Sequence, residues 1–265
     1  MANNGDFLFF AADEIGMKTT TEVIDTPTPP PVSRVDWMDA RGESHEHLPE
    51  LGLLDRELYL ATKQRTGHNY KGRRNYAGLH WFSNSGVHVW YESMLERRAL
   101  IWLDFTYDIV AIASQPMLLH FPDGTSHYPD FIALHASGRQ VLYNVKPEKF
   151  ITDKVRIQFA NATALGELAG WGHQVISTFE PTVIGNIEWL AQFRQSHFGP
   201  TEDIKQELLG QLHGSMSVGA AADLLTALTP TARIPALYNL AWYGHLTLDL
   251  THPLSISTLI RKANS

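Results

Sequence analysis

Asp130 and Lys146, at the two ends of a predicted β-hairpin, are residue types that act together on phosphodiester bonds. Tyr128 to Leu134 is rich in aromatic and β-branched residues, Ser137-Gly138 supplies a turn, and Val141 to Val145 resumes the strand pattern. Such a hairpin folds position 146 back towards position 130. The Asp130 carboxylate suits Mg²⁺ or Mn²⁺, and the Lys146 ammonium could hold an attacking water or stabilise charge on the phosphate. The spacing therefore predicts metal-dependent hydrolysis.

A predicted helix upstream could bring a further carboxylate to the same ion. The stretch YESMLERRALIWLDF has helical character, and its residues Glu92 and Glu96 are four apart. On a helix, residues at this spacing share one face. Either glutamate could therefore be directed at the metal.

Five short motifs in this region together resemble the PD-(D/E)xK, or restriction-endonuclease-like, nuclease core. They resemble most closely the TnsA-type endonuclease subunits of heteromeric transposases. The motifs are SMLE at 93–96, IASQP at 112–116, YPDF at 128–131, NVKP at 144–147 and NIEWL at 186–190. Their order and spacing carry the resemblance, because each motif alone is short.

The resemblance implies a role for each matching position. The catalytic acid, acid and lysine would be Glu96, Asp130 and Lys146, and Asn144 with the Val145 carbonyl would complete the metal shell. Three more residues receive secondary roles. Glu92 and Gln115 would support the site, and His127 would contact DNA or line the site.

Asn144 departs from the family pattern. Most nucleases of this superfamily have Glu or Asp two residues before the lysine, and TnsA-type subunits tolerate Gln there. An amide carbonyl is an oxygen ligand without charge, so it should bind the metal more weakly than a carboxylate. Weak or partner-dependent cleavage is the expected consequence.

The charge of the chain is unevenly distributed. The net charge is −7, yet residues 1–60 alone hold twelve acidic residues against four basic ones, a net −8. Residues 61–80 carry five basic residues and no acidic one, namely Lys63, Arg65, Lys71, Arg73 and Arg74. Basic residues interleaved with aromatic ones suit contacts to DNA phosphates, and an ordinary solvated loop is the alternative.

Composition limits the cellular setting. The chain has no cysteine, which excludes disulfides and thiolate metal sites, and no apolar run reaches the roughly 20 residues of a membrane span. Its first residues lack the basic start and apolar stretch of a signal peptide. We expect a bacterial cytoplasmic protein without a membrane partner.

Three regions are expected along the chain. Residues 1–60, with TPTPPP at 26–31, predict a loosely structured acidic arm. Residues 61–198 predict the nuclease domain, an α/β restriction-endonuclease-like core with a central mixed β-sheet flanked by helices. Residues 199–265 predict a small helical, winged-helix-like domain. Its few basic residues favour docking on a partner protein over reading DNA.

The predicted elements of the nuclease domain follow from periodicity and turn signals. The expected order is a hairpin at 80–93, a helix to 105, strands at 109–114, 117–121, 127–134 and 140–146, a helix at 151–169, a strand at 173–178, and a helix opened by Pro181.

Our leading hypothesis is a Mg²⁺-dependent endonuclease subunit of a TnsA-like transposase that cuts double-stranded DNA at transposon ends. The resemblance implies an integrase-like transposase subunit and a regulatory ATPase as partners. The ATPase must be a separate protein, because no phosphate-binding glycine loop occurs in this sequence. Two alternatives stay open. One is a stand-alone restriction or repair nuclease, and the other is a catalytically weak or inactive assembly module.

Overall fold

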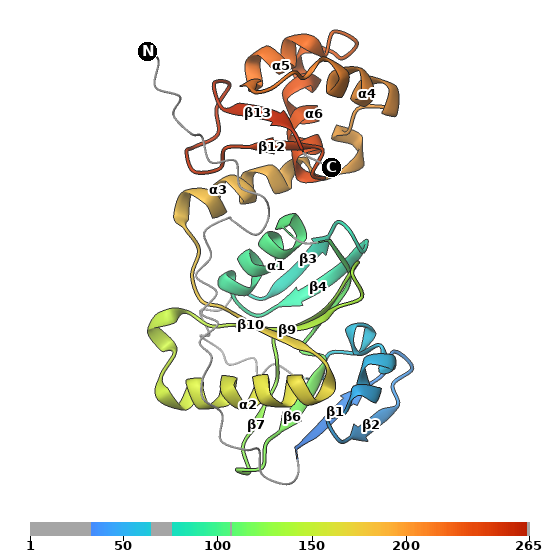
Figure 1. Cartoon of the computed structure of the whole chain (residues 1–265), viewed down its shortest axis with the longest axis vertical. Coiled ribbons are helices and arrows are strands. Elements are labelled where there is room, and N and C mark those ends of the chain that lie inside the picture. The colour runs from blue at the N-terminus through green and yellow to red at the C-terminus, as the bar shows by residue number, and fades with distance from the viewer. Residues whose placement is uncertain (1–32, 65–75, 107, 264–265) are drawn as a thin grey trace. The chain divides into compact units, whose positions relative to one another are not determined.

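The computed structural model describes residues 33–64, 76–106 and 108–263. The described chain divides into two compact units, residues 33–178 and residues 179–263. Figure 1 shows the helices and strands of each unit.

A mixed four-stranded sheet forms the centre of the first unit. Its strands are β5 (Ile109–Ser114), β8 (Phe131–His135), β9 (Gln140–Val145) and β10 (Gly172–Ile176), in the order β10-β9-β8-β5. Neighbours run antiparallel except β10 and β9, which are parallel. Two parallel neighbours need a crossover, and α2 (Asp153–Ala169) provides it. The expected mixed α/β architecture is thus confirmed.

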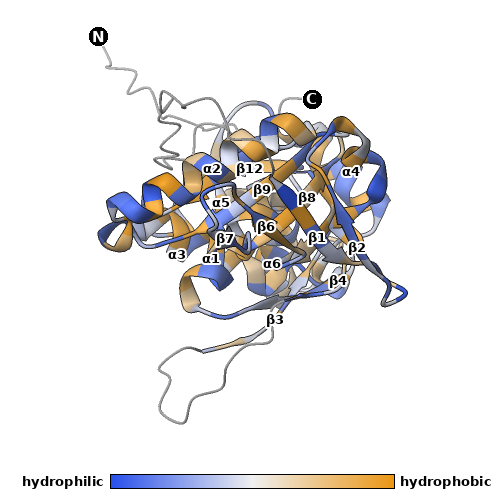
Figure 2. Cartoon of the chain, turned by 90° about the horizontal axis from the view of Figure 1, so that it is seen from below, coloured by the Kyte–Doolittle hydropathy of each residue, from blue (hydrophilic) through white to orange (hydrophobic). Residues whose placement is uncertain are grey.

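Helices α1 (Met94–Thr106) and α2 lie on opposite sides of this sheet (Figure 1). Along α2, hydrophilic and hydrophobic residues alternate, as Figure 2 shows. The apolar residues Ala162, Leu165 and Ala169 join Leu142 of β9 in one buried cluster. This amphipathic pattern fixes which face of α2 meets the sheet.

The β8–β9 hairpin is present, with its turn at Ser137 and Gly138 as expected. Phe131 pairs with Tyr143, and Gly138 in the turn has φ 83°, a left-handed conformation that favours glycine. The strand expected over 127–134 is split, however, into β7 (Ser126–His127) and β8. Pro129 has no N–H for a strand ladder, which accounts for the break directly before Asp130.

A second sheet shows that the expectation of a loose acidic arm is wrong for residues 34–60. Strands β1 (Arg34–Met38) and β2 (Ser44–His47) join β6 (Met117–His120) and β7 in the order β2-β1-β6-β7. Two 3₁₀ helices follow, η2 (Leu51–Arg56) and η3 (Leu58–Leu60). Their apolar side chains belong to the same buried hydrophobic cluster as Ala162, Leu165 and Ala169 of α2. The TPTPPP stretch lies outside the described residues.

The hairpin expected at 80–93 is present as β3 (Gly78–Phe82) and β4 (Val87–Tyr91). It packs against α1. The 3₁₀ helix η4 (Glu148–Phe150) then connects β9 to α2.

The second unit combines helices with a small antiparallel sheet. Its strands follow the order β11-β13-β12, and its first helix, α3, belongs to this unit. The elements are α3 (Pro181–Leu190), η5 (Ala191–Phe193), η6 (Ser196–Phe198), α4 (Glu202–Gln211), β11 (Met216–Ser217), α5 (Val218–Leu224), α6 (Pro230–Trp242), β12 (Leu246–Leu248) and β13 (Leu259–Lys262). The sequence analysis had assigned the segment of α3 to the nuclease domain.

No helix within the described ranges has both the length and the apolar character needed to cross a membrane.

The packing of η3 yields a stability prediction. Leu58 is fully buried, whereas Leu60 in the same 3₁₀ helix is 53% exposed. Leu58→Ala should lower the free energy of unfolding by about 2–5 kcal/mol, because it leaves a cavity in the core, and Leu60→Ala should lower it by under about 1 kcal/mol. Urea denaturation of both variants measures the difference. Equal effects would show that this segment is not part of the core.

Candidate functional site

The backbone holds Asp130 from both neighbouring strands. Its N–H donates to the Tyr143 carbonyl at 3.1 Å, and its carbonyl accepts from the Gln115 N–H at 2.8 Å. The side chain is also fixed, because Oδ2 accepts from the Val145 N–H at 2.6 Å. The Asp130 carboxylate therefore lies against the residue that precedes Lys146.

Lys146 directly follows β9. Its N–H donates to the Ile176 carbonyl at 3.0 Å, which extends the parallel pairing of β9 with β10 by one residue. The hairpin thus brings the backbone of position 146 back to Asp130, as the sequence predicted. A catalytic role for the Lys146 ammonium stays a prediction.

Glu96 caps the start of α1. The Glu96 N–H donates to the Ser93 Oγ at 3.2 Å, and the Ser93 hydroxyl donates back to Glu96 Oε1 at 2.9 Å. The Glu92 N–H donates to Glu96 Oε2 at 2.6 Å. Both carboxylate oxygens thus satisfy donors at the helix start, in a pattern close to a capping box. The SMLE motif consequently has a structural explanation beside a catalytic one.

Glu92 does not lie on the helix, contrary to expectation, because α1 begins at Met94. It meets Glu96 through its backbone N–H and not through a shared helical face. Glu92 Oε1 lies 3.7 Å from Lys63 Nζ, and this ammonium lies 4.4 Å from the centre of the Trp90 ring. A buried glutamate is thus compensated by a lysine from the predicted DNA-binding stretch.

Asn144 is only 1% exposed, and both ends of its amide are used. Asn144 Oδ1 lies 2.7 Å from His127 Nε2, and Asn144 Nδ2 lies 2.7 Å from His173 Nε2. His173 Nδ1 lies 2.8 Å from Thr163 Oγ1, whose hydroxyl donates to the Phe159 carbonyl at 3.0 Å.

These contacts fix the proton positions along the network. Because the Thr163 hydroxyl donates to a carbonyl, its oxygen accepts from the His173 Nδ1–H. His173 Nε2 is then the acceptor for the Asn144 amide, and Asn144 Oδ1 accepts from the His127 Nε2–H. Burial, and secondarily the nearby charge of His127, lowers the pKa of His173 to about 4. His173 is therefore neutral at pH 7.

An amide suits position 144 better than a carboxylate would in this network. An amide, unlike a carboxylate, can both accept from the His127 Nε2–H and donate to the neutral His173. The sequence analysis identified His127 and Asn144 but missed His173 and Thr163. Thr163 follows Phe159 by one helical turn, which places both on one face of α2, but only the tertiary structure brings His173 to them.

Gln115, predicted to support the site, lies between β5 and β6 in a left-handed conformation with φ 46°. It is 1% exposed, and its Oε1 is buried without a hydrogen-bond partner in the described structure. Its N–H is bound to the Asp130 carbonyl, and its carbonyl accepts from the Gln64 N–H at 2.9 Å. A strained conformation and an unsatisfied buried oxygen beside Asp130 are features that gather at functional sites.

The predicted DNA-binding residues lie partly outside the described ranges. Lys63 is described, whereas Arg65, Lys71, Arg73 and Arg74 lie outside the described residues. Their predicted contacts to phosphate remain a prediction.

A separate polar group lies at the β1–β2 turn. Asp39, Glu43 and His45 could offer ligand atoms within 4.8 Å of one another. The Asp39 oxygens already accept from the N–H groups of Arg41 and Glu43 and lie 3.0 Å from the His45 ring. These bonds lower the pKa of Asp39, the His45 contact contributing most. These hydrogen bonds within the turn explain why the three side chains lie close together, and they require no bound ion.

No protein-family model and no curated protein matches this chain. The candidate site is therefore defined by the contacts of Asp130, Gln115 and Asn144 described above.

The neutral state of His173 predicts a pH dependence. The pKa of His173 is about 4 in the folded protein, against an ordinary value of 6.5. Between pH 6.5 and 4, His173 therefore binds a proton in the unfolded chain but stays neutral in the folded protein. The free energy of unfolding should therefore fall as the pH drops from about 6.5 to 4, by at most about 3 kcal/mol. His173→Gln should remove this part of the decline, and His88→Gln, at an exposed position, should keep it. Urea titrations across this pH range measure it; identical profiles for wild type and His173→Gln would contradict the network.

Proposed function

We propose that this protein is a metal-dependent DNA endonuclease of the PD-(D/E)xK type. The observation that carries the proposal is the 2.6 Å hydrogen bond from the Val145 N–H to Asp130 Oδ2. It holds a carboxylate beside the residue that precedes Lys146. The motif similarity implies a pairing of acid and lysine, and this bond supports it by holding the Asp130 side chain against the backbone of β9.

The arrangement of elements supports the same proposal. The first unit has a central mixed sheet with α1 and α2 on opposite sides, as the resemblance implies for a restriction-endonuclease-like core (Figure 1). After α3, the second unit continues with helices α4 to α6 and the three-stranded sheet β11-β13-β12. This set of elements suits the winged-helix-like domain that we propose for partner contact.

The residue types that we propose for the site fit a hard divalent cation. Glu96 and Asp130 supply carboxylates, Gln115 supplies a buried Oε1 with no partner in the described structure, and no cysteine competes. A Mg²⁺ ion bound there, with Mn²⁺ as a substitute, would lower the pKa of a bound water and offset the charge of the phosphate.

The chain's own residues have separate tasks in this proposal. Asp130 and Glu96 bind the cation, helped by the Val145 carbonyl, and the Lys146 ammonium orients the attacking water. Asn144 Oδ1 already accepts one hydrogen bond from His127, which leaves it one lone pair for a metal. Gln115 Oε1, which has no hydrogen-bond partner in the described structure, is a second neutral oxygen.

The biological setting follows from the resemblance alone. We propose that the endonuclease cuts double-stranded DNA at transposon ends, beside an integrase-like transposase subunit and under a regulatory ATPase, in a bacterial cytoplasm. A stand-alone restriction or repair nuclease would use the same site. A neighbouring transposase gene would support the first reading, and a methyltransferase gene the second.

A catalytically inactive assembly module is a second candidate. Two observations favour it: both carboxylate oxygens of Glu96 accept hydrogen bonds at the start of α1, and the Asn144 amide lies between two histidines. Both residues would be retained for stability alone if the nuclease had lost its activity.

Glu96→Gln separates the structural role of Glu96 from a role in metal binding. Glutamine can still accept at the helix start, as it does in capping boxes, but it removes the charge. We expect Glu96→Gln to keep stability within about 1 kcal/mol and to reduce Mg²⁺-dependent cleavage by at least about 100-fold. Cleavage of transposon-end DNA with the partner transposase present, together with urea denaturation, measures both.

Two further variants provide the comparison. Asp130→Asn should lose cleavage to the same extent, whereas Glu92→Gln should retain most of it. Undiminished cleavage by Asp130→Asn would refute the metal assignment. No cleavage by the wild-type protein with Mg²⁺ or Mn²⁺ would favour the assembly module.

A further inference from the structure

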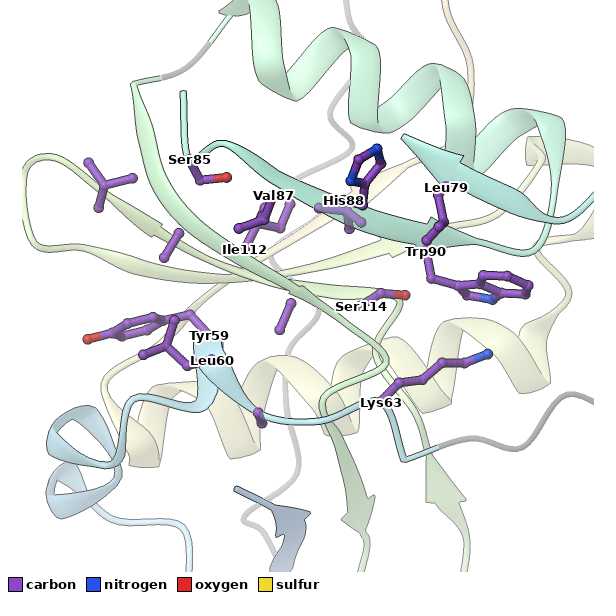
Figure 3. Close-up of a pocket in the computed structure, with 15 residues that line it drawn as sticks. Tyr59, Leu60, Lys63, Leu79, Ser85, Val87, His88, Trp90, Ile112 and Ser114 are labelled. Carbon is purple, nitrogen blue, oxygen red and sulfur yellow. The ribbon is translucent and has the colours of Figure 1, made fainter. Parts of the chain in front are cut away.

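A cavity of about 400 Å³ lies along the outer edge of β5 (Figure 3). All five consecutive residues from Val110 to Ser114 line it. Successive side chains of a strand point to opposite faces, so a cavity that meets every residue runs along the edge of the strand. β5 is the terminal strand of its sheet in the described chain. The cavity therefore borders backbone N–H and C=O groups that point out of the sheet.

The walls of this cavity are apolar and carry no acidic residue within the described chain. Ala61, Leu79, Val87, Val89 and Ile112 supply aliphatic surface from three separate segments. Edge strands are usually protected by charged residues or proline, yet β5 reads IVAIAS. Aliphatic walls with polar backbone along one side suit a planar ring with a hydrogen-bonding edge.

Three polar atoms of the lining residues lack a partner in the part of the chain that the structure describes. They are Ser114 Oγ, Ser85 Oγ and Trp90 Nε1, each of which can donate a hydrogen bond. Ser114 is 8% exposed, and its hydroxyl points towards the end of the cavity that holds Trp90 and Lys63 (Figure 3). Buried donors without a partner are expected where a ligand supplies the acceptors.

The Lys63 end of the cavity lies next to Glu92, which is bonded to Glu96 of the candidate metal site. Lys63 Nζ lies 3.7 Å from Glu92 Oε1, and the Glu92 N–H donates to Glu96 Oε2. Ser114 precedes Gln115, whose N–H donates to the Asp130 carbonyl. A ligand that reached from Ser114 to Lys63 would thus end beside the residues proposed to cut DNA.

We propose that this cavity binds an unstacked nucleobase, with the attached phosphate beside Lys63. The ring would lie between the aliphatic walls, its edge would face the backbone of β5 and the Ser114 and Trp90 donors, and the ammonium would attract the phosphate. The volume falls in the range of roughly 300–1,000 Å³ typical of small-molecule sites. The base could come from an unpaired DNA end or from a free nucleotide. The DNA source rests on the proposed nuclease function.

Calorimetric titration without metal tests the site separately from cleavage. The probes are dAMP, deoxyadenosine, a blunt DNA duplex and the same duplex with an unpaired 3′ deoxyadenosine tail. Wild-type protein should bind dAMP. Lys63→Gln should weaken dAMP binding about tenfold and leave deoxyadenosine binding unchanged, since only dAMP carries the phosphate. Ser114→Ala should weaken both about fivefold through the lost hydrogen bond.

Two variants complete the design. Ala61→Leu, which fills part of the cavity, should abolish binding of dAMP and of deoxyadenosine. Lys149→Gln, at an exposed lysine of η4, should leave the affinity for both probes unchanged. Thermal unfolding checks that each variant is folded. Tighter binding of the tailed than of the blunt duplex would assign the site to DNA ends, and dAMP binding without that preference would assign it to free nucleotides.

Absence of binding by dAMP and by the tailed duplex would overturn the proposal, as would equal binding by wild type and Ala61→Leu. Either result would leave the nuclease assignment standing, because the titrations require no cleavage. Conversely, base binding by an Asp130→Asn protein that no longer cuts would support both assignments.

Discussion

The site depends on the way three strands hold one aspartate. Asp130 is bound through its N–H to β9, through its carbonyl to the end of β5, and through its carboxylate to the Val145 N–H. These bonds exist only in the observed register of strands β5, β8 and β9. A shift by one residue would turn every side chain of a strand to the opposite face of the sheet. Pro129 lies between β7 and β8, and Asp130 directly precedes β8. The position of a polar side chain is thus set by the buried packing of its neighbours.

Polar residues have different roles on the two faces of the sheet. On the α2 side, Asn144 joins His127 and His173 in a buried hydrogen-bond network, which favours a fixed arrangement of these side chains. On the α1 side, Glu96 uses its charge at the helix start, where the dipole stabilises it. If the protein is a nuclease, the charge for the metal comes from Asp130 and the helix start, and position 144 positions the surrounding side chains.

Local sequence predicted much of this fold. The β3–β4 and β8–β9 hairpins and helices α1 and α2 follow from periodicity and turn residues close together in the chain. What failed was long-range pairing: the acidic composition of residues 1–60 concealed that Val35 and Trp37 alternate with polar residues and that β1 pairs with β6, over 80 positions later. Glu92 was placed on a helix because spacing alone does not show that Ser93 starts a new cap. His173 was missed because its contact with Asn144 spans 29 positions.

The central claim is that Asp130 anchors a divalent cation. Anomalous diffraction from crystals soaked in Mn²⁺ tests it most directly, because Mn²⁺ substitutes for Mg²⁺ at oxygen sites and scatters anomalously. The account predicts a single strong peak within bonding distance of the Asp130 carboxylate, absent from crystals of Asp130→Asn. An ion bound instead at Asp39, Glu43 and His45, with none at Asp130 under the same conditions, would contradict it.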